Sequence, residues 1–160
     1  MTISIGDRLP AATFRRMTPD GPAEITGDAL FAGRTVALFS VPGAFTPTCS
    51  ARHLPGFVER ADELRAKGID EIVCTAVNDV FVMDAWGKSA GAEGKVSMLA
   101  DGNGDFVKAL GLGMDASAVG MGQRGQRFSM VVEDGVVRLL NVEAPREYAV
   151  SSAEHLVGQL

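Results

Sequence analysis

The sequence predicts an α/β fold in which a central mixed β-sheet is flanked by helices. Residues 34–41 and 70–78 form short apolar segments, typical of strands buried on both faces, and a segment with helical spacing follows each of them. Residues 126–143 hold two further apolar segments, separated by Asp134-Gly135, a pair that favours a tight hairpin turn. Parallel strands with helical connections, completed by an antiparallel hairpin, make a mixed sheet.

The first predicted helix covers residues 49–68. It ends at Lys67-Gly68, a favourable C-terminal signal, and Pro55 should bend or interrupt its first turns. Its expected buried positions recur at helical spacing: Leu54, Phe57, Val58, Ala61 and Leu64.

The elements after the second strand complete the pattern. A helix should begin with Asn78 or Asp79 as its N-cap and bury Phe81, Val82 and Trp86. Residues 96–101 predict a third strand and 103–112 a short helix, and a serine-capped helix should close the chain at 151–160. This order of elements is that of a thioredoxin-like fold.

Length, composition and charge restrict the classes of function. The 160 residues, 46% hydrophobic and 22% charged, indicate one domain over residues 1–160 with an ordinary globular core. The net charge of -5 and the absence of a long Lys/Arg cluster argue against nucleic acid or a membrane as partner. No signal pattern or long apolar run is present. With two cysteines and two histidines, we expect no disulfide scaffold, metal or cofactor, and a reducing compartment, the cytoplasm.

Cys49 stands out because of where it occurs. It follows Pro47-Thr48 at the predicted start of a helix, where unpaired backbone N–H groups and the helix dipole favour an anion, here the thiolate. Its neighbours are hydroxyl residues, whereas a structural cysteine is expected within an apolar segment. Cys74, within "EIVCTAV", has that apolar setting and is predicted to be part of the core.

The segment "PGAFTPTC" places Pro42, Thr46 and Cys49 in a P-x-x-x-T-x-x-C arrangement. This arrangement resembles that of the peroxiredoxins, and the full sequence of the segment resembles their type II (atypical, peroxiredoxin-five-like) branch. The similarity continues through "HLPGF", "VNDVFVMDAW", "LADGNGDFVKALGL" and "RFSMVVEDG", so it covers nearly the whole chain. It implies a thioredoxin fold, thiol-dependent reduction of hydrogen peroxide and alkyl hydroperoxides, and Cys49 as the peroxidatic cysteine. Of two arginines three residues apart, Arg124 and Arg127, it selects Arg127 as the active-site arginine, because Arg127 directly precedes Phe-Ser-Met.

Peroxide reduction requires these residue types. The thiolate attacks one peroxide oxygen, so the site must orient the peroxide and stabilise charge on the departing oxygen. We expect the Thr46 hydroxyl, backbone N–H groups of the segment from Ala44 through Phe45 to Cys49, and the Arg127 guanidinium to bind the substrate. Pro42 should form a rigid wall without a donor.

Two features near Cys49 leave alternatives open. His53, four residues further along, is either a base for the thiol or a residue that orients the loop. Phe45, Phe81, Met83 and Trp86 are expected mainly in the core, but in this branch of the family such segments border a dimer contact, which predicts a homodimer.

Two other classes of function are weighed against a peroxidase. A thioredoxin-type oxidoreductase requires C-x-x-C, but Ser50-Ala51-Arg52 follows Cys49. A non-enzymatic binding or chaperone module would not need Pro42, Thr46, Cys49 and Arg127 together.

The sulfenic acid that forms on Cys49 must then be reduced. Some members of the branch carry a resolving cysteine after the last strand, where "NVEAPREYAVSS" has none, and Cys74 is predicted inside a strand. We therefore expect a one-cysteine mechanism, with glutathione and glutaredoxin, or thioredoxin, as reductant.

Overall fold

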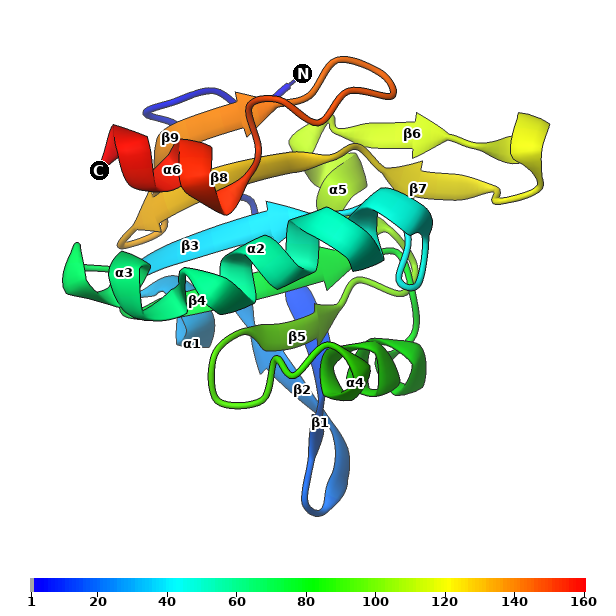
Figure 1. Ribbon diagram of the computed structural model, residues 1–160, viewed down its shortest axis with the longest axis horizontal. Helices are drawn as coiled ribbons and strands as arrows, with labels where there is room; N and C mark the ends of the chain where they lie inside the picture. Colours follow the sequence, from blue (N-terminus) through cyan, green and yellow to red (C-terminus); the bar gives the residue numbers. More distant parts are fainter. Residues whose placement is uncertain (1) are drawn as a thin grey trace.

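The computed structural model describes residues 2–160 and contains a seven-stranded sheet with the order β2-β1-β5-β4-β3-β8-β9 (Figure 1). The strands of this sheet are β1 (Thr13–Thr18), β2 (Gly21–Thr26), β3 (Thr35–Ser40), β4 (Glu71–Ala76), β5 (Ser97–Ala100), β8 (Phe128–Glu133) and β9 (Val136–Val142). A second sheet pairs β6 (Gly113–Asp115) with β7 (Gln123–Gly125).

The main sheet is mixed. Strand β4 runs parallel to β3 and to β5, whereas β8 is antiparallel to β3 and to β9. The turn between β8 and β9 is Asp134-Gly135, and both residues have a positive φ, as a tight hairpin turn requires. The predicted thioredoxin-like fold with a central mixed sheet is therefore confirmed.

Helices cover both faces of the sheet. They are α1 (Gly27–Phe31), the π-helix η1 (Cys49–His53), α2 (Leu54–Glu59), α3 (Ala61–Ala66), α4 (Val80–Ser89), α5 (Asp105–Leu110), the short η2 (Ser117–Val119) and α6 (Ala153–Gln159). One core cluster joins the sheet to α2, α3, α4 and α6, and the other joins it to α1 and α5. Figure 1 shows α2 and α3 crossing in front of β3 and β4.

The predicted helix over 49–68 is divided into three parts. Residues Cys49–His53 are a π-helix, in which the Leu54 N–H donates to the Cys49 carbonyl five residues earlier, and a break at Arg60 separates α2 from α3. Pro55 has no N–H to donate and its ring crowds the carbonyl of the preceding turn, so a wider turn accommodates it better than a regular α-helix. The predicted disturbance at Pro55 is thus observed.

Two expectations about burial are wrong. Phe81, predicted to be buried by its helix, is 64% exposed, and Phe45, expected mainly in the core, is 54% exposed. Met83 and Trp86 are buried as expected, because α4 directs these two positions toward the sheet. Strands β1, β2, β6 and β7 were not predicted, since each of them has at most one buried residue and none forms an apolar run.

Candidate active site

The loop that follows β3 brings Thr46 to the start of the Cys49 helix. The first helical hydrogen bond runs from the Ser50 N–H to the Thr46 carbonyl at 2.9 Å, so the N–H groups of Thr48 and Cys49 precede the regular ladder. The Thr46 hydroxyl donates to the Gly43 carbonyl at 2.6 Å. Its proton is therefore engaged, and its oxygen keeps lone pairs that can accept from a peroxide.

Asn78 holds the middle of the same loop. Its Oδ1 accepts from the Ala44 N–H at 2.9 Å, while the neighbouring Asp79 is the N-cap of α4 and accepts from Val82. The Ala44 N–H, expected to be a donor to substrate, is thus already paired within the protein. Phe45 follows with a φ of 64°, and its exposed ring lies 6.4 Å from that of Trp86.

The antiparallel pairing of β8 with β3 brings Arg127 to Cys49. Ser40 at the end of β3 pairs with Phe128, so Arg127, one residue before β8, lies beside the loop that follows β3. Its Nη2 donates to the Cys49 Sγ at 3.1 Å. Cys49 is fully buried, and a guanidinium at this distance stabilises a thiolate more strongly than it would in water.

His53 holds the other side of the guanidinium. Its Nε2 lies 2.9 Å from the Ser151 carbonyl oxygen and its Nδ1 lies 2.9 Å from the Arg127 Nη1. A carbonyl can only accept and a guanidinium can only donate, so this geometry assigns the proton to Nε2 and leaves Nδ1 as an acceptor. Burial, and then the Arg127 charge, lower the pKa of His53 to about 3. His53 is therefore neutral, and the Nδ1 lone pair that a base would need already accepts from Arg127. This favours His53 as a residue that orients the loop over His53 as a base for the thiol.

Arg124, the alternative arginine, is bound elsewhere. Its Nε donates to the Met121 carbonyl at 2.8 Å and its Nη1 to the Val77 carbonyl at 2.9 Å, so it holds the β6–β7 hairpin against the end of β4. Neither bond involves Cys49. The structure thus brings Arg127 to the thiol and His53 to Arg127, places Thr46 at the start of the Cys49 helix, and gives Arg124 a supporting position.

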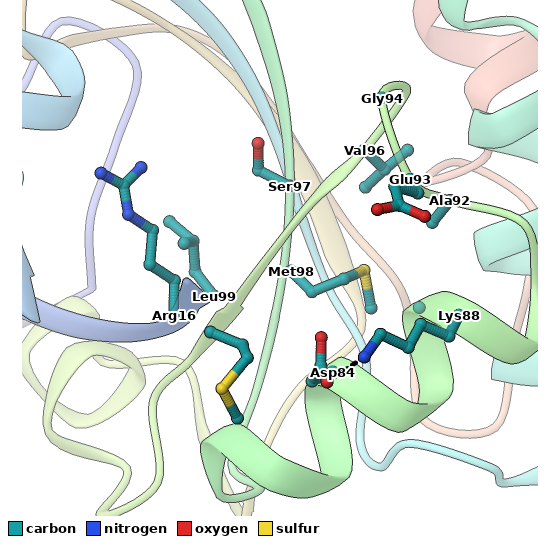
Figure 2. Close-up of a pocket in the computed structure, with 12 residues that line it drawn as sticks. Arg16, Asp84, Lys88, Ala92, Glu93, Gly94, Val96, Ser97, Met98 and Leu99 are labelled. Atoms are coloured by element: carbon teal, nitrogen blue, oxygen red, sulfur yellow. Dashed lines mark ion pairs between the residues drawn. The ribbon is translucent and has the colours of Figure 1, made fainter. Parts of the chain in front are cut away.

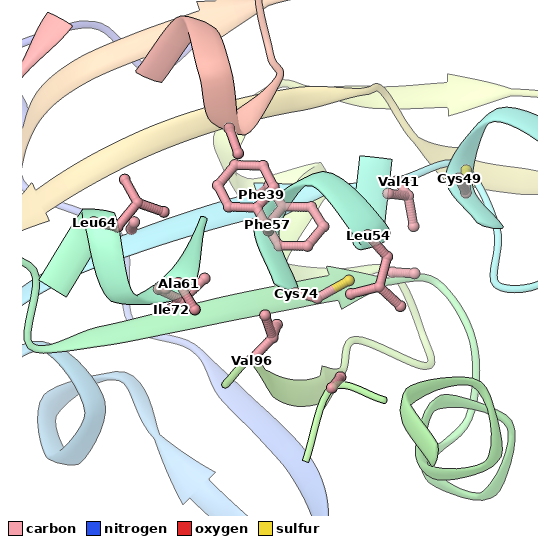
Figure 3. Packing of buried hydrophobic residues seen from close by; sticks show 14 of the residues in the cluster. Phe39, Val41, Cys49, Leu54, Phe57, Ala61, Leu64, Ile72, Cys74 and Val96 are labelled. Carbon is pink, nitrogen blue, oxygen red and sulfur yellow. The ribbon is translucent and has the colours of Figure 1, made fainter. Parts of the chain in front are cut away.

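Cys74 lies on β4 in the apolar core, as predicted. Figure 3 shows it among core side chains such as Leu54, with Cys49 at the edge of the same cluster. Burial and then the proximity of Cys49 raise the pKa of the Cys74 thiol well above its ordinary value. Both cysteines are free thiols. Cys74 is therefore a poor nucleophile, because the thiolate is the reactive form.

Sequence reasoning missed two groups that support the site. Asn78 was considered only as one of two N-cap residues, and its contact with Ala44 depends on the approach of two loops far apart in the sequence. The Ser151 carbonyl is a backbone group, so no residue type in the sequence could have indicated it.

Other features of the described chain lie away from this chemistry. A cavity of about 260 Å³ between α4 and β5 has charged walls, but Asp84 and Lys88 pair there at 3.0 Å (Figure 2). Within residues 2–160 there is no group of three or more His, Cys, Asp or Glu side chains placed to hold a metal ion. None of the helices described is both long and apolar enough to cross a membrane.

The chain is similar to known proteins over nearly its whole length. A family model described as Redoxin matches residues 4–157. The chain is 49% identical over 164 residues to Peroxiredoxin-2E-2, chloroplastic, from Oryza sativa subsp. japonica, covering 99% of this chain and 73% of that protein. It is 44% identical over 159 residues to Peroxiredoxin-2B from Arabidopsis thaliana, covering 99% and 98%. The crystal structure of reduced Prx3 in complex with H2O2 from Vibrio vulnificus superposes with a TM-score of 0.95 at 50% identity, covering 99% of both chains.

Proposed function

The chain belongs to the peroxiredoxin family of thiol peroxidases, and we propose that Cys49 is its peroxidatic residue, which reacts with hydrogen peroxide and alkyl hydroperoxides. The observation that supports this most is the Arg127 Nη2 donor, 3.1 Å from the buried Sγ. In the reaction, the thiolate sulfur bonds to one peroxide oxygen as the O–O bond breaks. Cys49 becomes a sulfenic acid, and the other oxygen leaves as water or an alcohol after it takes a proton.

The surrounding groups suit that step. Arg127 stabilises the thiolate before attack and can donate to a peroxide oxygen as negative charge moves onto the leaving group. The Thr46 hydroxyl oxygen can accept a hydrogen bond from the peroxide O–H, and the N–H groups of Thr48 and Cys49 are donors at the helix start. Pro42, half-buried in the same loop, adds no backbone N–H donor.

We also propose that the sulfenic acid is reduced by an external thiol, either glutathione with glutaredoxin or thioredoxin. A disulfide with Cys74 would need Cα atoms within about 7 Å and side chains that face one another. Cys74 is fully buried in β4, so such a bond would require local unfolding of a central strand. The segment after β9 contains no cysteine.

The proposal extends to assembly and compartment. Phe81 and Phe45 expose apolar rings, 64% and 54%, and both lie at or beside α4, which supports a homodimer formed through this surface. Replacing Phe81 with Ser should then lower the mass measured by analytical ultracentrifugation to that of one chain.

The free thiols Cys49 and Cys74 support a reducing compartment, which we propose is the cytoplasm.

Peroxide consumption by the purified protein, with several thiol donors, tests the proposal. Cys49→Ser should abolish consumption, whereas Cys74→Ser should leave the first turnover intact. If Cys74→Ser lost the first turnover and Cys49→Ser kept it, Cys74 and not Cys49 would be the thiol that reacts with peroxide.

A further inference from the structure

Glu143 is a buried acidic residue that the reaction described above does not use. It follows β9, is 6% exposed, and its carboxylate faces the backbone of residues 149–151. Its Oε2 accepts from the Ser151 hydroxyl at 2.6 Å, from the Ser151 N–H at 2.8 Å and from the Val150 N–H at 2.9 Å. The Ala149 N–H lies within 3.0 Å of both oxygens.

These donors keep the carboxylate ionised. Burial alone would raise the pKa of Glu143, but the hydrogen bonds from Ser151, Ala149 and Val150 outweigh that effect and the pKa lies below its usual value. Breaking these hydrogen bonds would leave a buried carboxylate without partners, which is strongly unfavourable. The carboxylate therefore fixes the position of the backbone that donates to it.

The loop closed by Glu143 reaches the active site at three points. The Ser151 carbonyl contacts His53 Nε2 at 2.9 Å. The Tyr148 ring stands edge-on to the imidazole with centroids 5.3 Å apart, and the Arg127 guanidinium carbon lies 5.9 Å from the centroid of that ring. The Glu143 N–H also donates to the Arg127 carbonyl at 3.0 Å.

We propose that Glu143 is a positioning residue for the peroxidase reaction: it holds the Ser151 carbonyl against His53 Nε2 and thereby leaves Nδ1 to hold Arg127 against Cys49. This inference rests on the roles of Cys49 and Arg127 given under Proposed function. Glu143 itself does not touch the sulfur; its influence passes through Ser151, His53 and Arg127.

The tautomer of His53 is the step on which this influence depends. With its proton on Nε2, the imidazole donates to Ser151 and accepts from Arg127, so both contacts are satisfied. If the Ser151 carbonyl moved away, the Nδ1–H tautomer would become available, and its N–H would face the N–H groups of Arg127. Two donors cannot bond to each other, so the guanidinium would lose the contact that sets its angle toward Cys49.

Nitrogen NMR of the imidazole tests the proposal in the wild-type protein without any variant. We expect His53 to be neutral at pH 7, with a protonated Nε2 and an unprotonated Nδ1. Glu143→Gln should populate the Nδ1–H form, while Glu147→Gln, which changes an exposed carboxylate of the same loop, should leave the wild-type spectrum. An Nδ1–H tautomer in the wild type, or an unchanged His53 spectrum in a folded Glu143→Gln variant, would overturn the proposal.

The rate constant for peroxide attack gives a second, independent test of the role of Glu143. Glu143→Gln should lower the second-order rate constant for peroxide attack by roughly tenfold to a hundredfold, and Glu147→Gln should not change it. In a His53→Ala background, adding Glu143→Gln should change the rate constant by less than about twofold, because the path from Glu143 is already broken. Equal, multiplicative losses in both backgrounds would mean that Glu143 affects the rate constant by a path that does not include His53, and would overturn the proposal. A wild-type protein that did not reduce peroxide would contradict the proposed function, and the His53 spectrum would still decide the role of Glu143.

Discussion

Arg127 makes two guanidinium contacts in different directions, and the proposed chemistry uses both. Nη2 donates to the Cys49 sulfur at 3.1 Å and Nη1 to His53 at 2.9 Å. A single contact would leave the guanidinium free to rotate, whereas two fix the direction in which its charge acts. The same cation can therefore stabilise the thiolate before attack and the departing oxygen during attack.

Replacing Arg127 with Met tests this role. We expect the rate constant for peroxide attack to fall by about 100-fold or more, because a charged donor to the reacting centre is lost. Stopped-flow kinetics with hydrogen peroxide measure this rate constant.

Arg124→Met is the control. Arg124 binds the carbonyls of Met121 and Val77, so its loss should weaken the hold on the β6–β7 hairpin and change the rate constant much less. Equal losses in the two variants would mean that both arginines act on the thiol.

Individual site residues were predictable from the sequence to different degrees. Cys49 was identified because hydroxyl residues, not apolar ones, surround it at a helix start, and the family resemblance selected Arg127 rather than Arg124. The exposed ring of Phe45 was not anticipated, and neither was the positive φ of this residue, which is rare for a side chain of its size. The choice between two roles for His53 needed the Ser151 carbonyl, which only folding brings near.

At the scale of elements, the buried strands were the easiest to predict. β3, β4 and β8 are apolar on both faces, so their composition alone distinguishes them. β1, with its sequence TFRRMT, is mostly exposed or half-buried and gives no such signal. Pro55 correctly indicated a disturbed helix, but the widened π-turn at Cys49–His53 follows from hydrogen-bond geometry that composition does not specify.

Cys74 on β4 should contribute to the stability of the core and not to the reaction with peroxide. Cys74→Ala removes a buried side chain from the core next to Leu54, so the free energy of unfolding should fall by about 1 to 2 kcal/mol. The rate constant for peroxide attack should stay at the wild-type value, since the thiol lies inside the strand. Urea unfolding and stopped-flow kinetics on the same sample measure both quantities, and a rate loss without a stability loss would contradict a purely structural role.

For the whole molecule, His53 links stability to pH. Burial and then Arg127 lower the pKa of His53 to about 3 in the folded chain, against 6.5 in the unfolded one. Below pH 6.5 the unfolded chain therefore binds a proton that the folded chain does not, and stability falls as the pH decreases toward 3. Between pH 7 and pH 5, this one group should reduce the free energy of unfolding by about 2 kcal/mol.

Denaturant unfolding at several pH values measures that slope. His53→Gln should flatten it, whereas the same change at His155, which is exposed on α6, should leave it as in the wild type. A wild-type protein equally stable at pH 5 and pH 7 would mean that His53 is not held neutral by its surroundings.

Intact mass and peptide mapping after one equivalent of hydrogen peroxide will decide whether Cys49 is the peroxidatic thiol and whether a second cysteine of the chain resolves it. Without added thiol, we expect a gain of one oxygen atom on the peptide that contains Cys49, and conversion of that species to a mixed disulfide when glutathione is added. Oxygen on the Cys74 peptide, or a rapid loss of two hydrogens with a Cys49–Cys74 cross-linked peptide, would contradict it.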